Sequence, residues 1–122
     1  MSKPLFPNKL TLLHNPRCSK SRAAKALLEE RGVAFRERLY LEEPLTAAEL
    51  RELKERLSLP ASQWVRRGES AYKDAGLTAD AKDTAILAAM ARQPILIERP
   101  ILISAKHAVV GRPPERVLEL LD

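Results

Sequence analysis

The chain has a single cysteine, Cys18, and its neighbours are polar and basic. It stands in the run His14-Asn-Pro-Arg-Cys-Ser-Lys-Ser-Arg22, between a short apolar stretch and a segment with helical spacing. In the first turn of a helix, unpaired backbone N–H groups and the positive end of the helix dipole favour thiolate over thiol. A lone cysteine is often a small buried hydrophobe, but such a residue is normally flanked by apolar side chains. We therefore expect Cys18 to be a catalytic thiolate that attacks a small oxyanion.

The residue three positions after Cys18 is Ser21, so the chain has C-x-x-S and not the C-x-x-C of a self-contained disulfide exchanger. An oxidised adduct at Cys18 must then be resolved by a thiol of another molecule. The residue six positions after Cys18 is Ala24, which excludes a C-x5-R phosphatase loop. With one cysteine and two distant histidines, His14 and His107, we expect no metal site and no bound cofactor.

Three arginines, Arg66, Arg99 and Arg112, stand in apolar or proline-rich surroundings. A guanidinium group in such a place is costly to bury unless its donors find an anion. Any one of them could pair with a protein carboxylate, but together with an activated cysteine they favour an oxyanion pocket. Arg99 precedes Pro100, and we expect this peptide bond to be cis, because X-Pro bonds adopt cis at low cost and do so in functionally placed turns. A cis-Pro100 would direct Arg99 toward Cys18.

The elements that position these residues form an α/β arrangement. Hydrophobic periodicity and turn residues predict strands over 9–13 and 33–41, helices over 19–31, 46–58 and 79–92, two strand-like runs within 94–103, and a last helix from about Pro113. This order gives a parallel pair joined through a helix, followed by an antiparallel pair. The expected fold is a thioredoxin-like four-stranded mixed sheet covered by helices, with an all-helical insert at about 46–92, in a single domain over 1–122.

Composition limits the classes of partner. The formal net charge of +5 could indicate nucleic acid, but charges alternate in sign and aromatic residues make up only 4% of the chain. We expect no nucleic-acid partner. No apolar run approaches the ~20 residues of a membrane span, and nothing near the N-terminus reads as a signal peptide. A single cysteine suits a reducing compartment, so we expect a cytoplasmic protein, without a membrane partner and monomeric.

Several segments, in order and at compatible spacing, resemble the arsenate reductase family of glutaredoxin-coupled type. They are HNPRC at 14–18, the 66–72 stretch that runs into Tyr-Lys-Asp-Ala-Gly-Leu, PILIERPILI at 94–103 and GRPPE at 111–115. The resemblance implies that Cys18 forms a covalent arsenic adduct, with His14 near this nucleophile as a second catalytic residue. It implies that Arg66, Arg99 and Arg112 hold the oxyanion, with glutathione as co-substrate and glutaredoxin as partner.

Two other functions remain compatible with these residues. One is a glutathione-dependent thiol reductase without arsenic specificity, acting on another thiol-reactive anion or on a disulfide. The other is an Spx-like regulator that binds RNA polymerase, since that group resembles the same fold. Many Spx-like proteins carry a C-x-x-C switch, whereas this chain has Ser21 at the second position, and a regulator gives the arginines no task.

Overall fold

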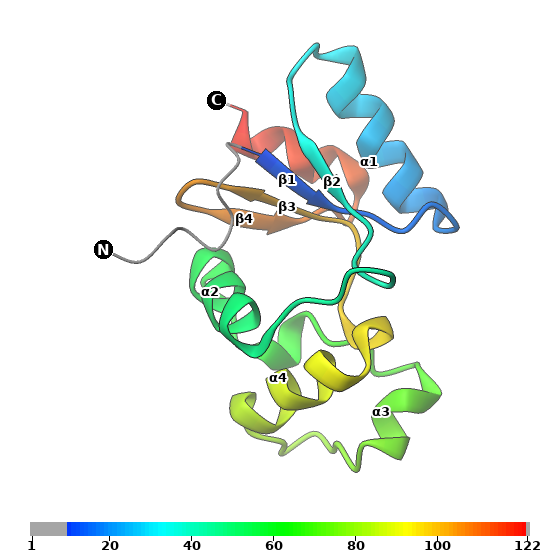
Figure 1. The fold of residues 1–122 in the computed structure, drawn as a ribbon, viewed down its shortest axis with the longest axis vertical. Coiled ribbons are helices and arrows are strands. Elements are labelled where there is room, and N and C mark those ends of the chain that lie inside the picture. Colours follow the sequence, from blue (N-terminus) through cyan, green and yellow to red (C-terminus); the bar gives the residue numbers. More distant parts are fainter. Residues whose placement is uncertain (1–9, 122) are drawn as a thin grey trace.

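A computed structural model describes residues 10–121. Its sheet has four strands in the order β2-β1-β3-β4 (Figure 1). β1 pairs in parallel with β2 and antiparallel with β3, and β3 pairs antiparallel with β4. The strands are β1 Leu10–Leu13, β2 Arg36–Arg38, β3 Ile101–Ser104 and β4 Ala108–Val110. The predicted four-stranded mixed sheet of thioredoxin-like layout is therefore confirmed.

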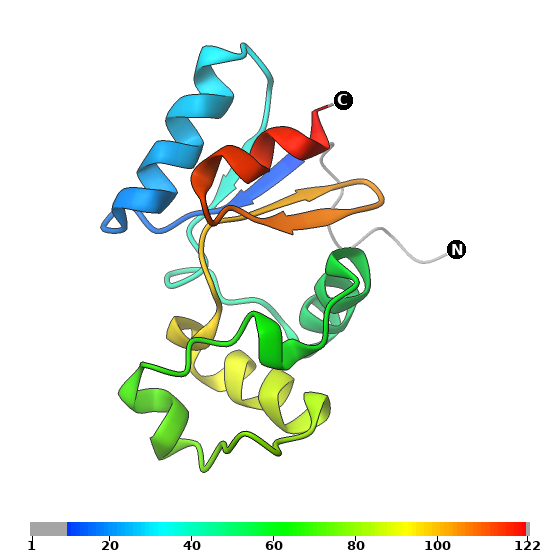
Figure 2. The same ribbon diagram turned by 180° about the vertical axis from the view of Figure 1, so that it is seen from behind.

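Side chains alternate between the two faces of the sheet and thereby build two cores. On one face, Leu12 and Leu102 pack with Leu28 of α1 and Val117 of η3. These helices, α1 Ser19–Glu30 and η3 Pro114–Leu120, lie side by side over that face (Figure 2). On the other face, Leu13, Ile101 and Ile103 belong to a larger cluster with the helices of the insert.

The insert between β2 and β3 is helical, as predicted, and lies below the sheet in Figure 1. It comprises α2 Ala47–Leu57, η1 Ala61–Gln63, α3 Ser70–Asp74, α4 Asp83–Arg92 and η2 Pro94–Leu96. Thr46 and Glu49 form a capping box at the start of α2. Glu49 also accepts a hydrogen bond of 3.0 Å from Arg38 at the end of β2, which ties the insert to the sheet. Among the described helices, none combines the length and apolar character that a bilayer crossing requires.

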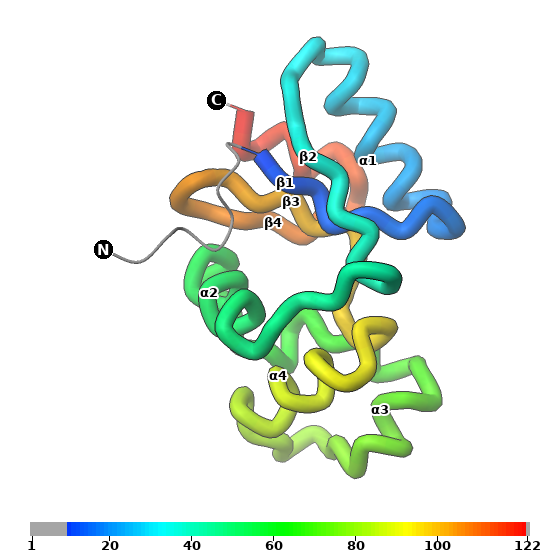
Figure 3. Tube along the Cα trace, in the orientation of Figure 1, coloured from blue at the N-terminus to red at the C-terminus, as the bar shows by residue number. Residues whose placement is uncertain are grey.

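The tube in Figure 3 makes the course of the chain from the insert into β3 easy to follow, and here one prediction is wrong. Residues 94–97 were expected to form a strand, but Pro94–Leu96 is the 3-10 helix η2, and Ile97 makes only an isolated bridge with Val65. The fourth strand is instead β4, which pairs antiparallel with β3 and lies in a stretch for which no strand was predicted. A short apolar run does not by itself distinguish a buried strand from a buried helical turn.

The second strand is also shorter than predicted: β2 covers Arg36–Arg38 within the expected range 33–41. It ends there because the carbonyl of Leu39 accepts hydrogen bonds from the backbone N–H groups of Glu42 and Glu43, which form a turn. The last helix begins at Pro114 and is of 3-10 type throughout.

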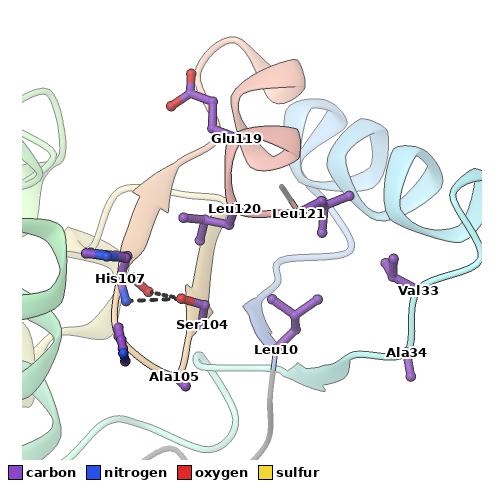
Figure 4. A pocket seen from close by; sticks show the side chains of 10 residues that line it. Leu10, Val33, Ala34, Ser104, Ala105, His107, Glu119, Leu120 and Leu121 are labelled. Atoms are coloured by element: carbon purple, nitrogen blue, oxygen red, sulfur yellow. Dashed lines mark hydrogen bonds between the residues drawn. The ribbon is translucent and has the colours of Figure 1, made fainter.

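A cavity of about 770 Å³ lies at the edge of the sheet where β1 begins and β3 turns into β4 (Figure 4). Leu10, Val33 and Leu120 are among its apolar lining residues. In the β3–β4 turn, the backbone N–H of His107 donates a 3.0 Å hydrogen bond to Ser104 Oγ. Cys18 follows the opposite end of β1, so this cavity is separate from the candidate active site.

Candidate active site

The register of the strands brings the predicted site residues, except Arg66 of the insert, to one edge of the sheet. Leu13 lies opposite both Arg38 and Ile101, and Ile101 lies opposite Val110. The segments that follow β1, β2 and β4 therefore leave the sheet at the same edge at which the chain enters β3. The segments that meet there are 14–18, 39–41, 98–100 and 111–112.

Cys18 is the N-cap residue of α1, with φ −95° and ψ 123°. Its backbone N–H donates to the carbonyl of Asn15 at 2.9 Å, and its carbonyl accepts from the N–H of Arg22 at 3.0 Å. Two further hydrogen bonds brace the loop, from the N–H of Arg17 to Asn15 Oδ1 and from Arg22 Nη1 to the carbonyl of Pro16. The half-buried thiol is thus held at a helix N-terminus, as the sequence predicts.

His14 lies behind this loop and is only 3% exposed. Its Nδ1 is 2.7 Å from Ser21 Oγ, which also accepts a 3.0 Å hydrogen bond from the N–H of Asn15. Nε2 lies 3.9 Å from Glu37 Oε1. Burial lowers the pKa of His14, and the nearby Glu37 carboxylate partly offsets this effect. These contacts give His14 a positioning role for the cysteine loop, while its predicted catalytic role stays a prediction.

Two of the predicted arginines, Arg66 and Arg112, meet at a carboxylate that the sequence analysis did not single out, that of Glu98. Glu98 Oε1 lies 3.4 Å from Arg66 Nη1 and 3.0 Å from Arg112 Nε. The same oxygen accepts a 3.2 Å hydrogen bond from the backbone N–H of Arg99. Arg112 Nε additionally donates to the carbonyl of Arg99 at 2.9 Å, and Arg66 Nη2 lies 3.2 Å from Glu69 Oε1. A cavity of about 290 Å³ opens beside these groups.

Several guanidinium nitrogens of the site are buried without an acceptor. They are Nε and Nη1 of Arg99 and Nε of Arg66. A buried donor without a partner is costly, and that cost is larger for a charged group. An anion with several acceptor oxygens would satisfy these donors, because guanidinium groups match such oxygens geometrically. Within residues 10–121, no group of three His, Cys, Asp or Glu side chains is arranged to hold a metal ion.

The Arg99–Pro100 peptide bond is cis, as predicted from the sequence. The Arg112–Pro113 bond is also cis, which was not predicted. Gly111 packs directly on Pro100: its backbone N–H donates to the Pro100 carbonyl at 2.8 Å. A β-carbon at Gly111 would lie 2.8 Å from Pro100 Cγ, so only glycine allows the two loops this approach. The packing fixes Arg99 and Arg112 relative to each other.

Tyr40 is a further residue of the site that the sequence analysis assigned only to a strand. It is fully buried, and its hydroxyl has no hydrogen-bond partner. Burial raises the pKa of Tyr40; the charge of Arg66 opposes this rise, while that of Cys18 adds to it. Glu98 and Arg112 act on the same hydroxyl. The charges of Cys18 and of the arginine cluster thus both act on this one phenol.

Comparison with known proteins agrees with this geometry. The model of the ArsC family matches residues 13–120. A protein of Neisseria meningitidis named arsenate reductase is 42% identical over 114 residues, which cover 92% of this chain and 97% of the relative. A Haemophilus influenzae protein of the same name is 38% identical over 112 residues, covering 90% and 97% of the two chains.

Solved structures show the same relationship. The structure titled arsenate reductase from Vibrio cholerae superimposes with a TM-score of 0.86 at 43% identity, covering 91% of this chain and 96% of that one. The family match spans the cysteine loop, the insert and both loops that carry the other arginines. On this evidence the chain is a member of the ArsC family.

Proposed function

We propose that this chain reduces arsenate to arsenite through a covalent adduct at Cys18, with glutathione and glutaredoxin supplying the electrons. The observation that carries the proposal is a helix-terminal cysteine at the sheet edge to which the Arg99 and Arg112 loops also lead, with Arg66 meeting Arg112 at Glu98. Two of these arginines, Arg66 and Arg99, have buried donors that lack acceptors. Relatives that align over nearly the whole chain bear the name arsenate reductase. This supports an oxyanion of the arsenate type as the substrate.

In the first step the thiolate of Cys18 attacks arsenic and forms an S–As bond. An As–O bond breaks, and the leaving oxygen takes up a proton and departs as water. Arsenic is still pentavalent at this stage, since no electrons have been transferred. As the remaining oxygens rearrange around arsenic, their negative charge is neutralised by Arg66, Arg99 and Arg112.

Reduction requires two electrons, and the chain has no second thiol. Ser21 occupies the position of a resolving cysteine, but it is fully buried and bound to His14 and Asn15. External thiols must therefore complete the reaction. The thiolate of glutathione attacks the sulfur of Cys18, the S–As bond breaks with its electron pair remaining on arsenic, and arsenite leaves. A glutaredoxin thiolate then attacks the glutathione sulfur of the resulting mixed disulfide and releases the Cys18 thiolate. In sum, arsenate and two thiols give arsenite, one disulfide and water. This need for external thiols fits a cytoplasmic location. We propose that the protein acts there as a monomer.

The test is arsenate-dependent NADPH consumption with glutathione, glutaredoxin and glutathione reductase present. Wild-type protein should turn over, and omission of glutaredoxin should stop it. Cys18→Ser should abolish turnover while the fold, followed by circular dichroism, is kept. Turnover of Cys18→Ser near the wild-type rate would remove Cys18 from the mechanism. Wild-type turnover without glutaredoxin would remove that partner from the proposal.

A second arm of the test addresses the arginines. Arg99→Ala should weaken apparent arsenate affinity by about 2 kcal/mol, because charge-assisted hydrogen bonds to the oxyanion are lost. Arg116→Ala is the matched control: Arg116 is an exposed arginine of η3 paired only at the surface with Glu119. It should leave the affinity unchanged. Equal affinities of the two variants would contradict an oxyanion site at Arg99.

A further inference from the structure

Glu98 places a negative charge in the centre of a site that is built to bind an anion. Its side chain is 24% exposed and lines the cavity beside Arg66 and Arg112. Its backbone N–H donates to the carbonyl of Trp64 at 3.0 Å, and the adjacent peptide N–H of Arg99 donates to its carboxylate. Glu98 is thus held from both sides and cannot leave the site without breaking these bonds.

The contacts of this carboxylate are unevenly divided between its two oxygens. Its hydrogen bonds from Arg66 and from the backbone of Arg99 end on Oε1, and so does its closest approach to Arg112. Oε2 therefore keeps capacity to accept a further hydrogen bond. A carboxylate only accepts hydrogen bonds, whereas the arginines around it only donate them. The cavity consequently offers a bound ligand both donors and one strong acceptor.

Tetrahedral oxyanions differ in how they meet such a mixed set of partners. Sulfate is fully ionised at neutral pH, so all its oxygens are acceptors, and it would face the Glu98 carboxylate with repulsion and no hydrogen bond. Arsenate and phosphate retain at least one proton, and their hydroxyl group can donate to Glu98 while the other oxygens face the arginines. The Glu98 carboxylate therefore weakens the binding of a protonated oxyanion less than it weakens the binding of a fully ionised one.

We propose that Glu98 is a specificity-determining residue that accepts a hydrogen bond from the hydroxyl of a protonated oxyanion and disfavours fully ionised ones. The inference rests on the proposed function, because it takes the arginine cluster to be the oxyanion site. The alternative task for Glu98 is merely to hold the arginines in place. Glu69 also pairs with Arg66, from the adjoining helical segment. Replacing Glu69 therefore tests whether losing a carboxylate partner of this arginine is enough to change the selectivity among oxyanions.

The experiment measures binding of inorganic phosphate, arsenate and sulfate to the full chain by calorimetry, at neutral pH and without thiols. Wild-type protein should bind phosphate and arsenate at least tenfold more tightly than sulfate. Glu98→Gln keeps the shape and one acceptor but loses the charge, and should bind sulfate at least tenfold more tightly than wild type does. The preference for phosphate should largely disappear. Glu69→Gln removes a charge beside the same arginine and should leave the preference intact.

A wild-type comparison makes the test independent of any variant's folding. Monofluorophosphate has the shape and charge of hydrogen phosphate, with fluorine in place of the hydroxyl group. Wild-type protein should bind phosphate at least tenfold more tightly than monofluorophosphate. Equal affinities for these two ligands would overturn the inference, and so would an unchanged phosphate-to-sulfate ratio in Glu98→Gln. If wild type binds none of the oxyanions, the proposed function fails as well; if it binds them without these differences, only the role of Glu98 fails.

Discussion

Tyr40→Phe should make the folded chain more stable, although Tyr40 belongs to the candidate active site. The residue is fully buried, and its hydroxyl lacks a hydrogen-bond partner. A buried polar group without a partner costs roughly 1 to 3 kcal/mol. Phenylalanine removes that group and keeps the ring that packs in the larger core. We expect the free energy of unfolding to rise by about 1 kcal/mol at neutral pH, which corresponds to roughly 4 °C in the melting temperature.

The difference between the two proteins should grow at alkaline pH. Burial raises the pKa of Tyr40 above its ordinary value, so the folded chain keeps this proton after the unfolded chain has lost it. Above the unfolded value of about 10, the wild-type free energy of unfolding therefore falls by up to ~1.4 kcal/mol per pH unit from this group alone. Tyr40→Phe lacks this loss, so its advantage increases as the pH rises.

The assay is urea unfolding of both proteins at neutral pH and at several alkaline values, followed by circular dichroism. Tyr72→Phe is the matched control, because Tyr72 in α3 is the other tyrosine of the chain and is partly exposed. It should change stability little at any of these pH values. A Tyr40→Phe protein that is less stable than wild type, with a pH-independent difference, would refute the reasoning and show that the hydroxyl has a partner, such as a bound water molecule.

Two further predictions concern the loops of the site. Gly111→Ala should lower the free energy of unfolding by about 1 to 3 kcal/mol, because the added β-carbon would overlap the Pro100 ring. Gly68→Ala is the control, since a β-carbon at Gly68 would have no atom within 4 Å and should cause no steric destabilisation. Thermal unfolding of both variants checks this prediction. Burial lowers the pKa of His14 in the folded chain below the value of about 6.5 that histidine has in the unfolded chain. The wild-type free energy of unfolding should therefore decline as the pH falls below about 6.5, because the unfolded chain takes up this proton first. His14→Asn keeps an acceptor for Ser21 without a titrating group and should lose this decline; an identical pH profile for the two proteins would contradict a buried neutral His14.

Local sequence was sufficient to predict the part of the site that local structure builds. Cys18 sits at a helix N-terminus because the Asn-Pro turn and the following apolar spacing fix where α1 begins. The cis bond before Pro100 also followed from its place at the start of a strand. Arg66 and Arg112 lie together, as the idea of a shared pocket requires. The first two conclusions each depend on a short segment of chain, whereas the meeting of Arg66 with Arg112 depends on the fold.

The features that were missed depend on pairing between distant segments. Tyr40 enters the site because β1 and β2 run in parallel with Leu13 opposite Arg38, a register that periodicity alone does not give. Glu98 reads in the sequence as a turn residue, and its side-chain partners Arg66 and Arg112 reach it from distant segments of the chain. The run 94–97 is apolar because it is buried, and burial does not specify a strand.

The bridge between Val65 and Ile97 determines how this protein could be recombined with its relatives. Arg66 donates its backbone N–H to the carbonyl of Leu96 at 2.7 Å, and Glu98 donates to the carbonyl of Trp64 at 3.0 Å. These bonds flank the bridge and join the chain segments that carry Arg66 and Glu98. A chimaera with a crossover point between residues 66 and 96 would pair halves that did not evolve together. Crossovers before residue 64 and after residue 98 would transfer the paired segments as one unit.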